Sequence, residues 1–254
     1  MNYIHPTMMS EHWLDIRDMI YENYANDFGF NDLISIGTTA FESIDKLKAG
    51  YPNCEKCIAY QLEPLVDTHW HTKEKIFNNL SGADEVWDYD LDNINILRDH
   101  GINAKHKPFL YTESLKRVEN SADPDIDVLF FGTLTKDRLE VLRSISDICN
   151  LVVVRLFTGA KLDEFIARSK IVLDLHTQDG GRQKQSRIYY SLINNKCILS
   201  EKSNINYFGD LIIEAYASQM TVACSLILNN GLWRNYLNVS DRFNLLSKSI
   251  RNQL

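Results

Sequence analysis

Short apolar runs alternate with helical patterns along the second half of the chain, and this alternation restricts the fold more than any other feature. Runs such as LVVVRLF and KIVLDLH have the length of strands and are rich in β-branched residues. Strands are expected at 127–133, 151–157, 170–176 and 196–201. Helices are expected at 136–149, 161–169 and 185–195, the last ended by an Asn pair. Alternation of this kind is typical of a parallel sheet wrapped by helices.

The first half of the chain repeats this pattern with less regularity. Strands are expected at 32–39, 56–63, 84–90 and 104–110. Helical stretches at 42–50 and 91–101 close on Gly50 and Gly101, because glycine most easily takes the left-handed conformation that follows a helix. The two halves together predict an α/β protein with two Rossmann-like domains facing a cleft.

Domain boundaries follow from a polar stretch between the two halves. Residues 113–126 contain Pro124 and lack a strand pattern, which is typical of a linker. The N-terminal domain is therefore expected over 1–112. The C-terminal domain is expected over 127–254, and its sequence after residue 210 is again helical in pattern.

Composition places the chain among ordinary globular proteins, with 44% hydrophobic and 24% charged residues. Its formal net charge of -7 gives no general basic field and excludes histone-like binding of nucleic acid. No apolar run approaches the ~18 residues of a membrane span, and the opening MNYIHPTMMSEHWLD does not fit a signal peptide. The odd number of cysteines, 5, favours reduced thiols, so we expect a cytoplasmic protein.

Two loops after expected strands combine glycines with basic side chains. One contains Gly132, Thr133 and Arg138 at the head of a helix; the other, TQDGGRQKQSR at 177–187, leads into the helix at 185–195. Ligands of open parallel sheets bind beyond the carboxyl ends of the strands, and helix N-termini with guanidinium groups suit a phosphate or diphosphate. The chain has neither a Walker sequence nor a Gly-x-Gly-x-x-Gly after a strand, which disfavours a nucleotide triphosphatase and a dehydrogenase.

Six segments, taken in order, carry a family resemblance. In the second half these are DIDVLFFGTLTKDR (125–138), SKIVLDLHTQDGG (169–181) and SRIYYSLINNKCILSE (186–201). In the first half they are CIAYQLEPL (57–65), DEVWDYDLDNINIL (84–97) and HGINAKHKPFLY (100–111). Together they cover roughly residues 57 to 201 and resemble the small GT-B-type nucleotide-sugar glycosyltransferases of bacteria and phages. The resemblance implies a GT-B-like fold, an acceptor-side N-terminal domain and transfer of a sugar from a nucleotide-sugar donor held chiefly by the C-terminal domain.

The resemblance also implies donor-binding residues. Gly132 and Thr133 match the family's Gly-Ser turn, Arg138 matches a basic residue after it, Arg187 matches the arginine under the donor phosphates, and Glu201 matches the closing Ser-Glu. Where many relatives have a loop glutamate, this chain has Arg182, Gln183, Lys184 and Gln185, and Arg182 and Lys184 are expected to add positive charge to the donor site. Arg187→Ala is expected to weaken nucleotide-diphosphate binding and to leave the fold intact.

The catalytic base is expected in the N-terminal domain, because family members of the inverting type deprotonate the acceptor hydroxyl with an Asp, Glu or His there. Glu63 follows an apolar strand and is the first candidate; His69 and His71 are the alternatives. A retaining reaction would need no such base. Two other functions stay open, a relative that binds nucleotide sugar or glycan without turnover and a phosphate-binding structural module.

Two acidic series and one cysteine pair have a metal-site alternative. Asp88, Asp90 and Asp92 form a DxDxD series, as do Asp123, Asp125 and Asp127, and the DxD of GT-A glycosyltransferases binds a divalent cation. The first series opens a helix and the second lies in the expected linker, which favours capping roles and a metal-independent enzyme. Cys54 and Cys57 form a CxxC without the further ligands of a zinc site. We therefore expect no metal and no cofactor besides the nucleotide-sugar co-substrate.

The acceptor is expected to be a base of hydroxymethylated DNA, with a soluble glycan or protein as the alternative. The composition suits an AT-rich genome such as a phage's, and relatives in phages glycosylate such bases; the protein would then act in the host cytoplasm. Lys105, His106 and Lys107 could line a basic cleft with residues 182–187, and a flipped base could enter it. No membrane partner is expected, and the oligomeric state stays open.

Overall fold

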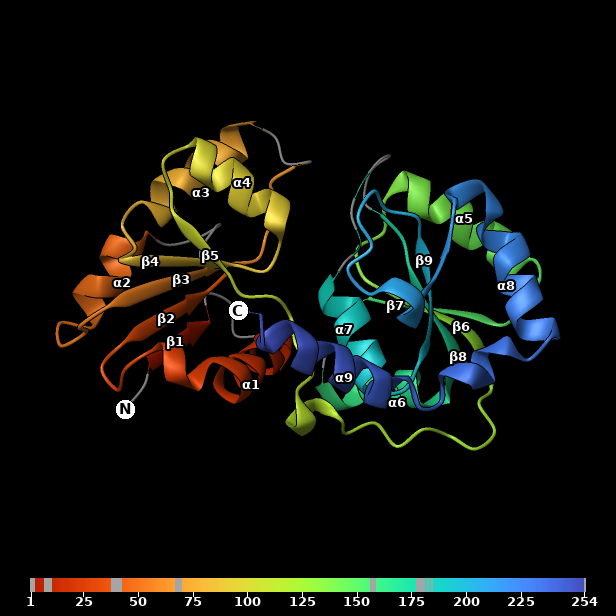
Figure 1. Cartoon of the computed structure of the whole chain (residues 1–254). Coiled ribbons are helices and arrows are strands. Elements are labelled where there is room, and N and C mark those ends of the chain that lie inside the picture. Colours follow the sequence, from red (N-terminus) through yellow and green to blue (C-terminus); the bar gives the residue numbers. More distant parts are fainter. Residues whose placement is uncertain are drawn as a thin grey trace. The chain divides into compact units, whose positions relative to one another are not determined.

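The structure is a computed structural model that describes residues 3–6, 11–37, 43–66, 70–155, 159–176, 181, 183 and 185–253. For residues 3–6, 11–13, 70 and 71 it describes the backbone alone. The chain divides into two compact units, Met1–Phe109 (unit 1) and Leu110–Leu254 (unit 2). Each unit contains a five-stranded parallel sheet flanked by helices (Figure 1).

The sheet of unit 1 has the strand order β1-β2-β3-β4-β5. Its strands are β1 (Tyr3–Pro6), β2 (Leu33–Ile36), β3 (Cys57–Gln61), β4 (Glu85–Asp88) and β5 (Ala104–His106). Its helices are α1 (Glu11–Tyr24), α2 (Ile44–Gly50), α3 (Trp70–Leu80) and α4 (Leu91–Asp99), with the 3-10 turn η1 (Ala25–Asp27). Leu33 lies opposite Cys57, and Val86 lies opposite Ala104. Since every strand is parallel to its neighbours, their carboxyl ends form one edge of the sheet.

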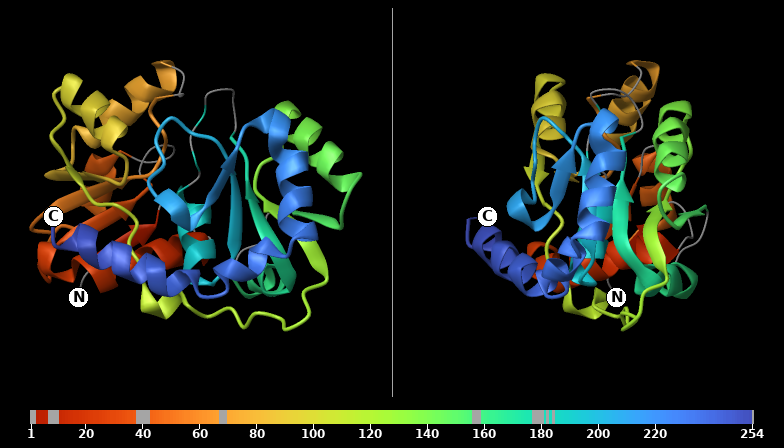
Figure 2. Two further views of the ribbon diagram at one scale, coloured as in Figure 1. Left: turned by 45° about the vertical axis from the view of Figure 1, so that its right-hand side comes forward. Right: turned by 90° about the vertical axis from the view of Figure 1, so that its right-hand side faces the viewer.

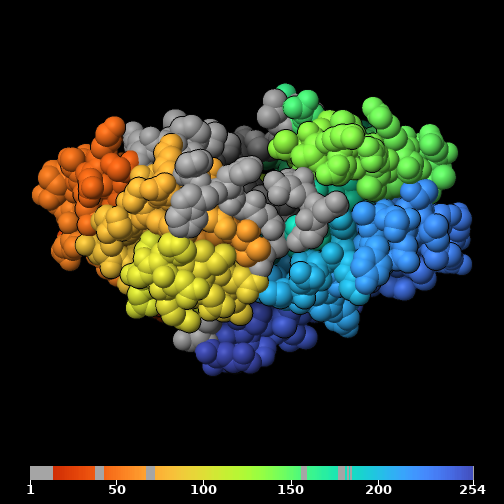
Figure 3. All heavy atoms as spheres, turned by 90° about the horizontal axis from the view of Figure 1, so that it is seen from above, coloured from red at the N-terminus to blue at the C-terminus, as the bar shows by residue number. Residues whose placement is uncertain are grey.

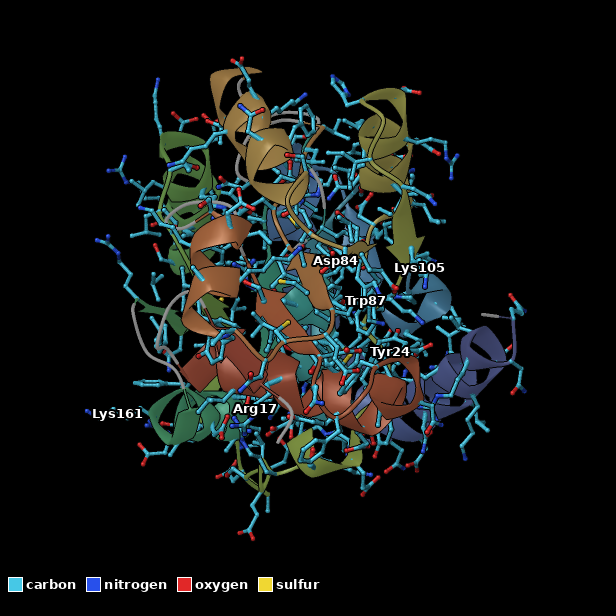
Figure 4. All side chains as sticks on the ribbon, turned by 90° about the vertical axis from the view of Figure 1, so that its left-hand side faces the viewer. Arg17, Tyr24, Asp84, Trp87, Lys105 and Lys161 are labelled. Atoms are coloured by element: carbon cyan, nitrogen blue, oxygen red, sulfur yellow. The ribbon has the colours of Figure 1, made fainter. Side chains whose placement is uncertain are left out.

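Helices cover both faces of this sheet, because alternate side chains of a strand point to opposite faces. Val86 of β4 packs into a core with Ile76 of α3 and Ile94 of α4. The next residue, Trp87, packs on the other face against Tyr24 of α1, with ring centroids 5.9 Å apart (Figure 4). Burial on both faces explains why β2 and β3 are mostly apolar and buried along their whole length.

The sheet of unit 2 has the order β10-β9-β8-β6-β7. Its strands are β6 (Ile126–Phe131), β7 (Leu151–Val154), β8 (Ser169–Asp174), β9 (Cys197–Glu201) and β10 (Ile213–Ala215). The helices are α5 (Lys136–Ser146), α6 (Gly159–Arg168), α7 (Gln185–Ile193), α8 (Met220–Asn229) and α9 (Val239–Arg251). The 3-10 turns are η2 (Glu113–Leu115), η3 (Gly209–Leu211), η4 (Ala217–Gln219) and η5 (Leu232–Tyr236). The order reverses between β6 and β8, which is where open α/β sheets bind ligands.

The helices of unit 2 lie on opposite sides of its sheet. Leu142 of α5 and Cys224 of α8 share a core with Phe130 of β6. Helix α7 lies on the other side, as the left view of Figure 2 shows. Helices α5 and α8 lie side by side, and their outer surfaces are visible in Figure 3. Among the helices of the described residues, none is long and apolar enough to cross a membrane.

The expected alternation of strands and helices is confirmed, and both sheets are parallel. Gly101 follows α4 with a φ of +77°, and Asn195 of the Asn pair follows α7 with a φ of +58°, so both helices end in a left-handed residue as expected. The same expectation is wrong for Gly50, which is the last residue of α2 and has no positive φ. Helix α2 is capped by Tyr51, whose amide donates to the Lys48 carbonyl.

Other differences concern strand lengths and further elements. Strand β5 is shorter than the expected 104–110 because Pro108 cannot donate to a strand ladder. Strand β7 ends at Val154, and residues 156–158 lie outside the described residues. The elements β1, α1, α3 and β10 were not among those expected by range. In the segment 113–126, the amides of Arg117 and Val118 both donate to Asn194 Oδ1 at 3.0 Å, which attaches it to the end of α7.

Candidate functional site

The candidate site lies at the carboxyl edge of the sheet of unit 2, where β6, β8 and β9 end. The turn after β6 begins with Gly132, whose φ of +143° is a conformation that residues with a Cβ rarely adopt. A Cβ on Gly132 would come within 3.0 Å of Arg187 Nη2, so glycine is needed here for close approach as well. Helix α5 starts four residues later, and its N-cap is Thr135, whose hydroxyl accepts from the Arg138 amide at 3.4 Å.

Arg187 lies in the first turn of α7 and is 8% exposed. Its Nη1 donates to Asp174 Oδ1 at 2.5 Å, and its guanidinium lies over the rings of Phe130 and Phe131 at 5.0 and 5.3 Å. Burial lowers the pKa of Arg187, while the charge of Asp174 opposes that shift. Its Nε is buried and has no hydrogen-bond partner among the described residues. This nitrogen is therefore a donor of a charged group that no described residue satisfies.

Asp174 anchors this arrangement from the end of β8. The residue is 0% exposed, and its Oδ2 accepts from the Ser200 hydroxyl of β9 at 3.2 Å. Sequence reasoning missed Asp174 because it counted the residue as part of an apolar strand. The strand-end rule could have found it, since a carboxylate that ends a buried strand needs a partner at the same edge.

Arg138 is 2% exposed and its guanidinium is bound to backbone carbonyls. Its Nε donates to the His176 carbonyl at 2.9 Å, its Nη1 donates to the Thr133 carbonyl at 2.7 Å, and its Nη2 donates to the Leu175 carbonyl. Burial is the main cause that lowers the pKa of Arg138 to about 10. The side chain thus ties the start of α5 to the end of β8 and to the turn after β6.

A cavity of about 390 Å³ opens beside Arg138, between α5, the turn η4, the start of α8 and the ends of β8 and β9. Its lining includes the carboxylates Asp137, Glu140 and Glu201 together with Leu175 and His176. The side chain of Glu201 accepts from the His176 amide at 2.8 Å. The structure therefore places Glu201, one of the expected donor-binding residues, in the wall of a cavity.

The loop before α7 is described only in part. Arg182 and Lys184, both expected at the donor site, lie outside the described residues. Gln183 is described and is 5% exposed, and its Nε2 donates to Glu214 Oε1 at 3.0 Å. Since Glu214 belongs to β10, this hydrogen bond fixes part of the loop against the edge of the sheet.

The three candidate bases of unit 1 have different positions. Glu63 follows β3 with an exposed side chain, and its carbonyl accepts from Asn93 Nδ2 at 2.9 Å. His69 lies outside the described residues, and His71 lies in α3 with only its backbone described. The turn at Glu63 is held further by Gln61, whose Oε1 accepts from the Glu63 amide at 2.6 Å.

The first acidic series caps a helix. Asp90 is the N-cap of α4 and accepts from the amides of Asp92 and Asn93. Asp88 Oδ1 accepts from the Asp90 amide at 2.8 Å, and burial raises the pKa of Asp88 well above its ordinary value. Because Asp88 is 0% exposed and hydrogen-bonded within unit 1, it belongs to the internal structure of this strand end.

The second acidic series forms ion pairs. Asp125 pairs with Arg168, and Asp127 pairs with Lys170 at 2.6 Å. Among the described residues there is no group of three or more His, Cys, Asp or Glu placed to hold a metal ion. The five cysteines are free thiols, and Cys54 and Cys57 are not joined.

Comparison with known proteins concerns the fold. No protein-family model and no curated protein matches the chain. Among solved structures, TarM matches with a TM-score of 0.53 and 8% identity over 84% of this chain and 50% of TarM. A glycosylation associate protein (Gap123) complex from Streptococcus agalactiae matches with a TM-score of 0.49 and 10% identity over 94% of this chain and 57% of that one. Spinosyn rhamnosyltransferase SpnG, complexed with thymidine diphosphate, matches with a TM-score of 0.44 and 9% identity over 94% of this chain and 79% of that one.

The chain thus spans 50% and 57% of the length of the first two neighbours. At 8% identity the match with TarM establishes the fold, and it agrees with the two Rossmann-like parallel sheets described above. The chain therefore has the fold of the GT-B glycosyltransferases, the family that its sequence resembles.

Proposed function

We propose that this protein is a glycosyltransferase that moves a sugar from a nucleotide-sugar donor to an acceptor hydroxyl, with the donor bound by unit 2. The observation that carries the proposal is Arg187, a buried cation at the carboxyl edge of a Rossmann-like sheet, whose Nε has no hydrogen-bond partner among the described residues. A buried donor of this kind is costly unless a ligand satisfies it. A nucleoside diphosphate supplies anionic oxygens that match a guanidinium.

Three features of unit 2 support a diphosphate at this place. Arg187 lies in the first turn of α7, where backbone amides and the helix dipole favour an anion. Gly132 allows the turn after β6 to approach the guanidinium closely. The 390 Å³ cavity lined by Glu201 lies at the same edge of the sheet and offers space for the remainder of a nucleotide. Thr133, Arg182 and Lys184 are proposed as further donor-binding residues on the family resemblance.

The proposed reaction forms a bond between the acceptor oxygen and the anomeric carbon of the sugar. The bond from that carbon to the diphosphate oxygen breaks, and the diphosphate leaves with the electron pair. Arg187 would stabilise the negative charge that develops on this leaving group. In an inverting reaction the acceptor proton would pass to Glu63, or to His69 or His71, in unit 1. Glu63 suits this role because its side chain is exposed on a turn held by Gln61 and Asn93.

The buried ion pair changes the mutational test that the sequence suggests. Arg187→Ala would remove the ion-pair partner of the buried Asp174 carboxylate, which costs about 3 to 5 kcal/mol of folding free energy. The double variant Asp174→Asn with Arg187→Met removes both charges, so it is expected to be more stable than Arg187→Ala. Both variants are expected to bind nucleoside diphosphate about 10- to 100-fold more weakly than the wild type, since each lacks the charge-assisted contact.

The measurement is calorimetric titration of wild type and variants with UDP, GDP, ADP and TDP, with folding checked by thermal unfolding. Mass spectrometry of a candidate acceptor after incubation with the matching nucleotide sugars then tests transfer. A folded double variant that binds as tightly as the wild type would remove Arg187 from the donor site. A wild type that binds none of the four nucleotides would overturn the donor-binding proposal.

The acceptor proposal rests on the sequence resemblance. A hydroxymethylated base in DNA is the first candidate, and a soluble glycan or protein is the second. Lys105 pairs with Glu85 at 2.9 Å and Lys107 pairs with Asp27 at 3.0 Å, so these acidic partners offset part of the positive charge expected for a DNA cleft. Incubation of the enzyme and its donor with hydroxymethylcytosine-containing and plain duplexes decides between the two. A mass increase that is confined to the modified duplex and weakens as salt rises supports DNA.

A further inference from the structure

Three buried polar side chains converge on the turn that carries Glu63. Gln61 ends β3, Asp88 ends β4, and Asn93 lies in the first turn of α4. Each of the three is 0% exposed, and Gln61 and Asp88 are register partners in neighbouring strands. Buried polar groups cost free energy unless they are hydrogen-bonded. Their hydrogen bonds therefore show what these side chains hold in place.

Asn93 binds the backbone of this turn at two points. Its Nδ2 donates to the Glu63 carbonyl at 2.9 Å, and its Oδ1 accepts from the Leu65 amide at 2.8 Å. A backbone carbonyl only accepts and a backbone amide only donates, so these contacts determine which end of the Asn93 side chain is the oxygen. A flipped side chain would lose both contacts. Asn93 thus binds the turn in one orientation.

Asp88 fixes that orientation of Asn93. The Asn93 Nδ2 also donates to the Asp88 carboxyl group, at 3.1 Å to Oδ2 and 3.3 Å to Oδ1. One hydrogen of Nδ2 therefore points to Glu63 and the other to Asp88. Asp88 is held in turn by the Asp90 amide, which donates to its Oδ1 at 2.8 Å. The side chain that binds the turn is thus anchored to the end of β4 and to the start of α4.

Gln61 binds Glu63 independently of Asn93. Its Oε1 accepts from the Glu63 amide at 2.6 Å, and its Nε2 donates to the Glu63 carbonyl. Both backbone polar groups of Glu63 are therefore bound by buried side chains, while its own side chain is exposed. Pro64 follows directly, and its ring restricts the backbone further. Water could satisfy the backbone of an exposed turn, so this network adds rigidity at the point where the Glu63 side chain leaves the backbone.

We propose that Asn93 and Gln61 are positioning residues for sugar transfer, which hold the turn at Glu63 so that its carboxylate reaches the acceptor hydroxyl. This inference rests on the proposed function, because it concerns the base named there. A general base acts only within hydrogen-bond reach of the proton that it accepts. A displacement of about 1 Å in such a group lowers a rate by about 100-fold. Asp88 contributes through Asn93, which it anchors.

Hydrolysis of a nucleotide sugar tests this role without knowledge of the natural acceptor. The water oxygen bonds to the anomeric carbon, its proton passes to Glu63, and the nucleoside diphosphate leaves with the electron pair of the broken bond. Release of nucleoside diphosphate from UDP-, GDP-, ADP- and TDP-glucose gives kcat. N93A and Q61M are each expected to lower kcat about 10- to 100-fold. The Kd of the same nucleoside diphosphate is expected to be unchanged, since its site is proposed in unit 2.

A double-mutant cycle with E63Q separates positioning from a general loss of structure. E63Q removes the base and is expected to lower kcat about 100- to 10,000-fold. In this background N93A and Q61M are expected to leave kcat nearly unchanged, because no base is left to position. D84A is the control, because Asp84 Oδ2 accepts from the Cys57 amide at 2.7 Å at the amino edge of the same sheet. This variant is expected to destabilise unit 1 and to keep the kcat of the wild type.

The outcomes distinguish failure of this inference from failure of the proposed function. A wild type that neither hydrolyses these sugars nor modifies the hydroxymethylcytosine duplex overturns both. An active wild type overturns the inference alone when E63Q is equally active, or when folded N93A or Q61M keeps the wild-type kcat. Equal losses from N93A with and without E63Q, or from N93A and D84A, also overturn it, because the effect would then not pass through Glu63. Thermal unfolding identifies the variants that fold, and the two positions keep the test decisive when one variant does not.

Discussion

Gly132 and Arg187 depend on each other at the scale of single residues. The guanidinium occupies the space that a side chain at position 132 would need, and the φ of +143° at Gly132 excludes most other residues independently. Gly132→Ala is therefore expected to displace Arg187 and to weaken binding of nucleoside diphosphate by about 10-fold or more. The strained backbone is expected to reduce the free energy of unfolding by about 1 to 3 kcal/mol. Calorimetric titration and chemical unfolding measure the two effects.

Gly101→Ala is the matched control for this change. Gly101 also has a positive φ, +77°, but a Cβ there would meet nothing within 4 Å. The Gly101→Ala variant is expected to lose a similar free energy of unfolding through backbone strain and to keep the nucleotide affinity of the wild type. Equal affinity losses in the two variants would show that backbone strain, and not the contact with Arg187, governs binding.

The site was predictable from sequence only as far as loops can be placed at strand ends. Parallel strands bring the residues after β6, β8 and β9 together, and that rule alone puts Gly132, Arg187 and Glu201 at one edge. The sequence could not show that Arg187 is buried with Asp174, because burial depends on the packing of Phe130 and Phe131 around it. Nor could it show that Arg138 is bound to backbone carbonyls, since backbone atoms carry no sequence signal.

At the scale of elements, long periodic segments were predictable and short ones were not. The strands β6, β8 and β9 and the helices α5 and α7 match the expected ranges to within three residues at each end, because their apolar patterns are strong. Strand β10, Ile213–Ala215, is a strand only through its pairing with β9, a tertiary contact that three residues cannot signal. Helix α1 carries Ile16, Met19 and Ile20 at helical spacing, so its pattern was present but unused.

Lys196 stabilises the junction between α6 and β8. Its Nζ donates to the carbonyls of Ala167 and Ser169 at 3.3 and 2.9 Å, and burial lowers its pKa to about 8. A pKa lowered on folding means that the unfolded chain holds the proton more tightly between about pH 8 and the ordinary lysine value of about 10.4. The penalty of burying this charge is thus present below pH 8 and disappears as the pH rises. The free energy of unfolding is therefore expected to rise by up to about 3 kcal/mol between about pH 8 and pH 10.4.

Urea unfolding of wild type and Lys196→Met at several pH values from 7 to 10.5 measures this contribution. The thiols and tyrosines that titrate in the same pH range contribute equally to both proteins, so their contributions cancel in the difference. The difference in unfolding free energy, wild type minus variant, is expected to rise with pH. Parallel curves for the two proteins would mean that Lys196 does not change its proton affinity on folding.

The capping role of the first acidic series leads to a prediction about metal dependence. Asp88 and Asp90 direct their carboxylate oxygens to amides at the start of α4, and Asp88 is fully buried. Carboxylates used in this way are poorly placed to bridge a diphosphate through a cation. Sugar transfer is therefore expected to continue at an unchanged rate after treatment with EDTA. Loss of turnover that Mn²⁺ restores would contradict this expectation.

At the scale of the whole molecule, each unit has a hydrophobic core of its own. One core joins β2, β3 and β4 to α2, α3 and α4, and it lies within unit 1. A second joins β6, β8 and β9 to α5 and α8, and it lies within unit 2. Because the cores are separate, each unit can open without the other. A ligand then raises the unfolding free energy only of the unit that binds it.

Buried cysteines report on the two cores independently. Cys57 belongs to the core of unit 1, and Cys197 and Cys224 belong to that of unit 2; burial raises the pKa of each thiol to about 12. Such thiols react with a labelling reagent only when the core opens.

A nucleotide such as UDP, present at about 100 times its Kd, stabilises the unit that binds it by about 2.7 kcal/mol. It is therefore expected to slow the labelling of Cys197 and Cys224 about 100-fold and to leave Cys57 unchanged, as measured by mass spectrometry of labelled peptides. Equal slowing at all three cysteines would mean that the units unfold together, and slowing at Cys57 alone would move the nucleotide site to unit 1.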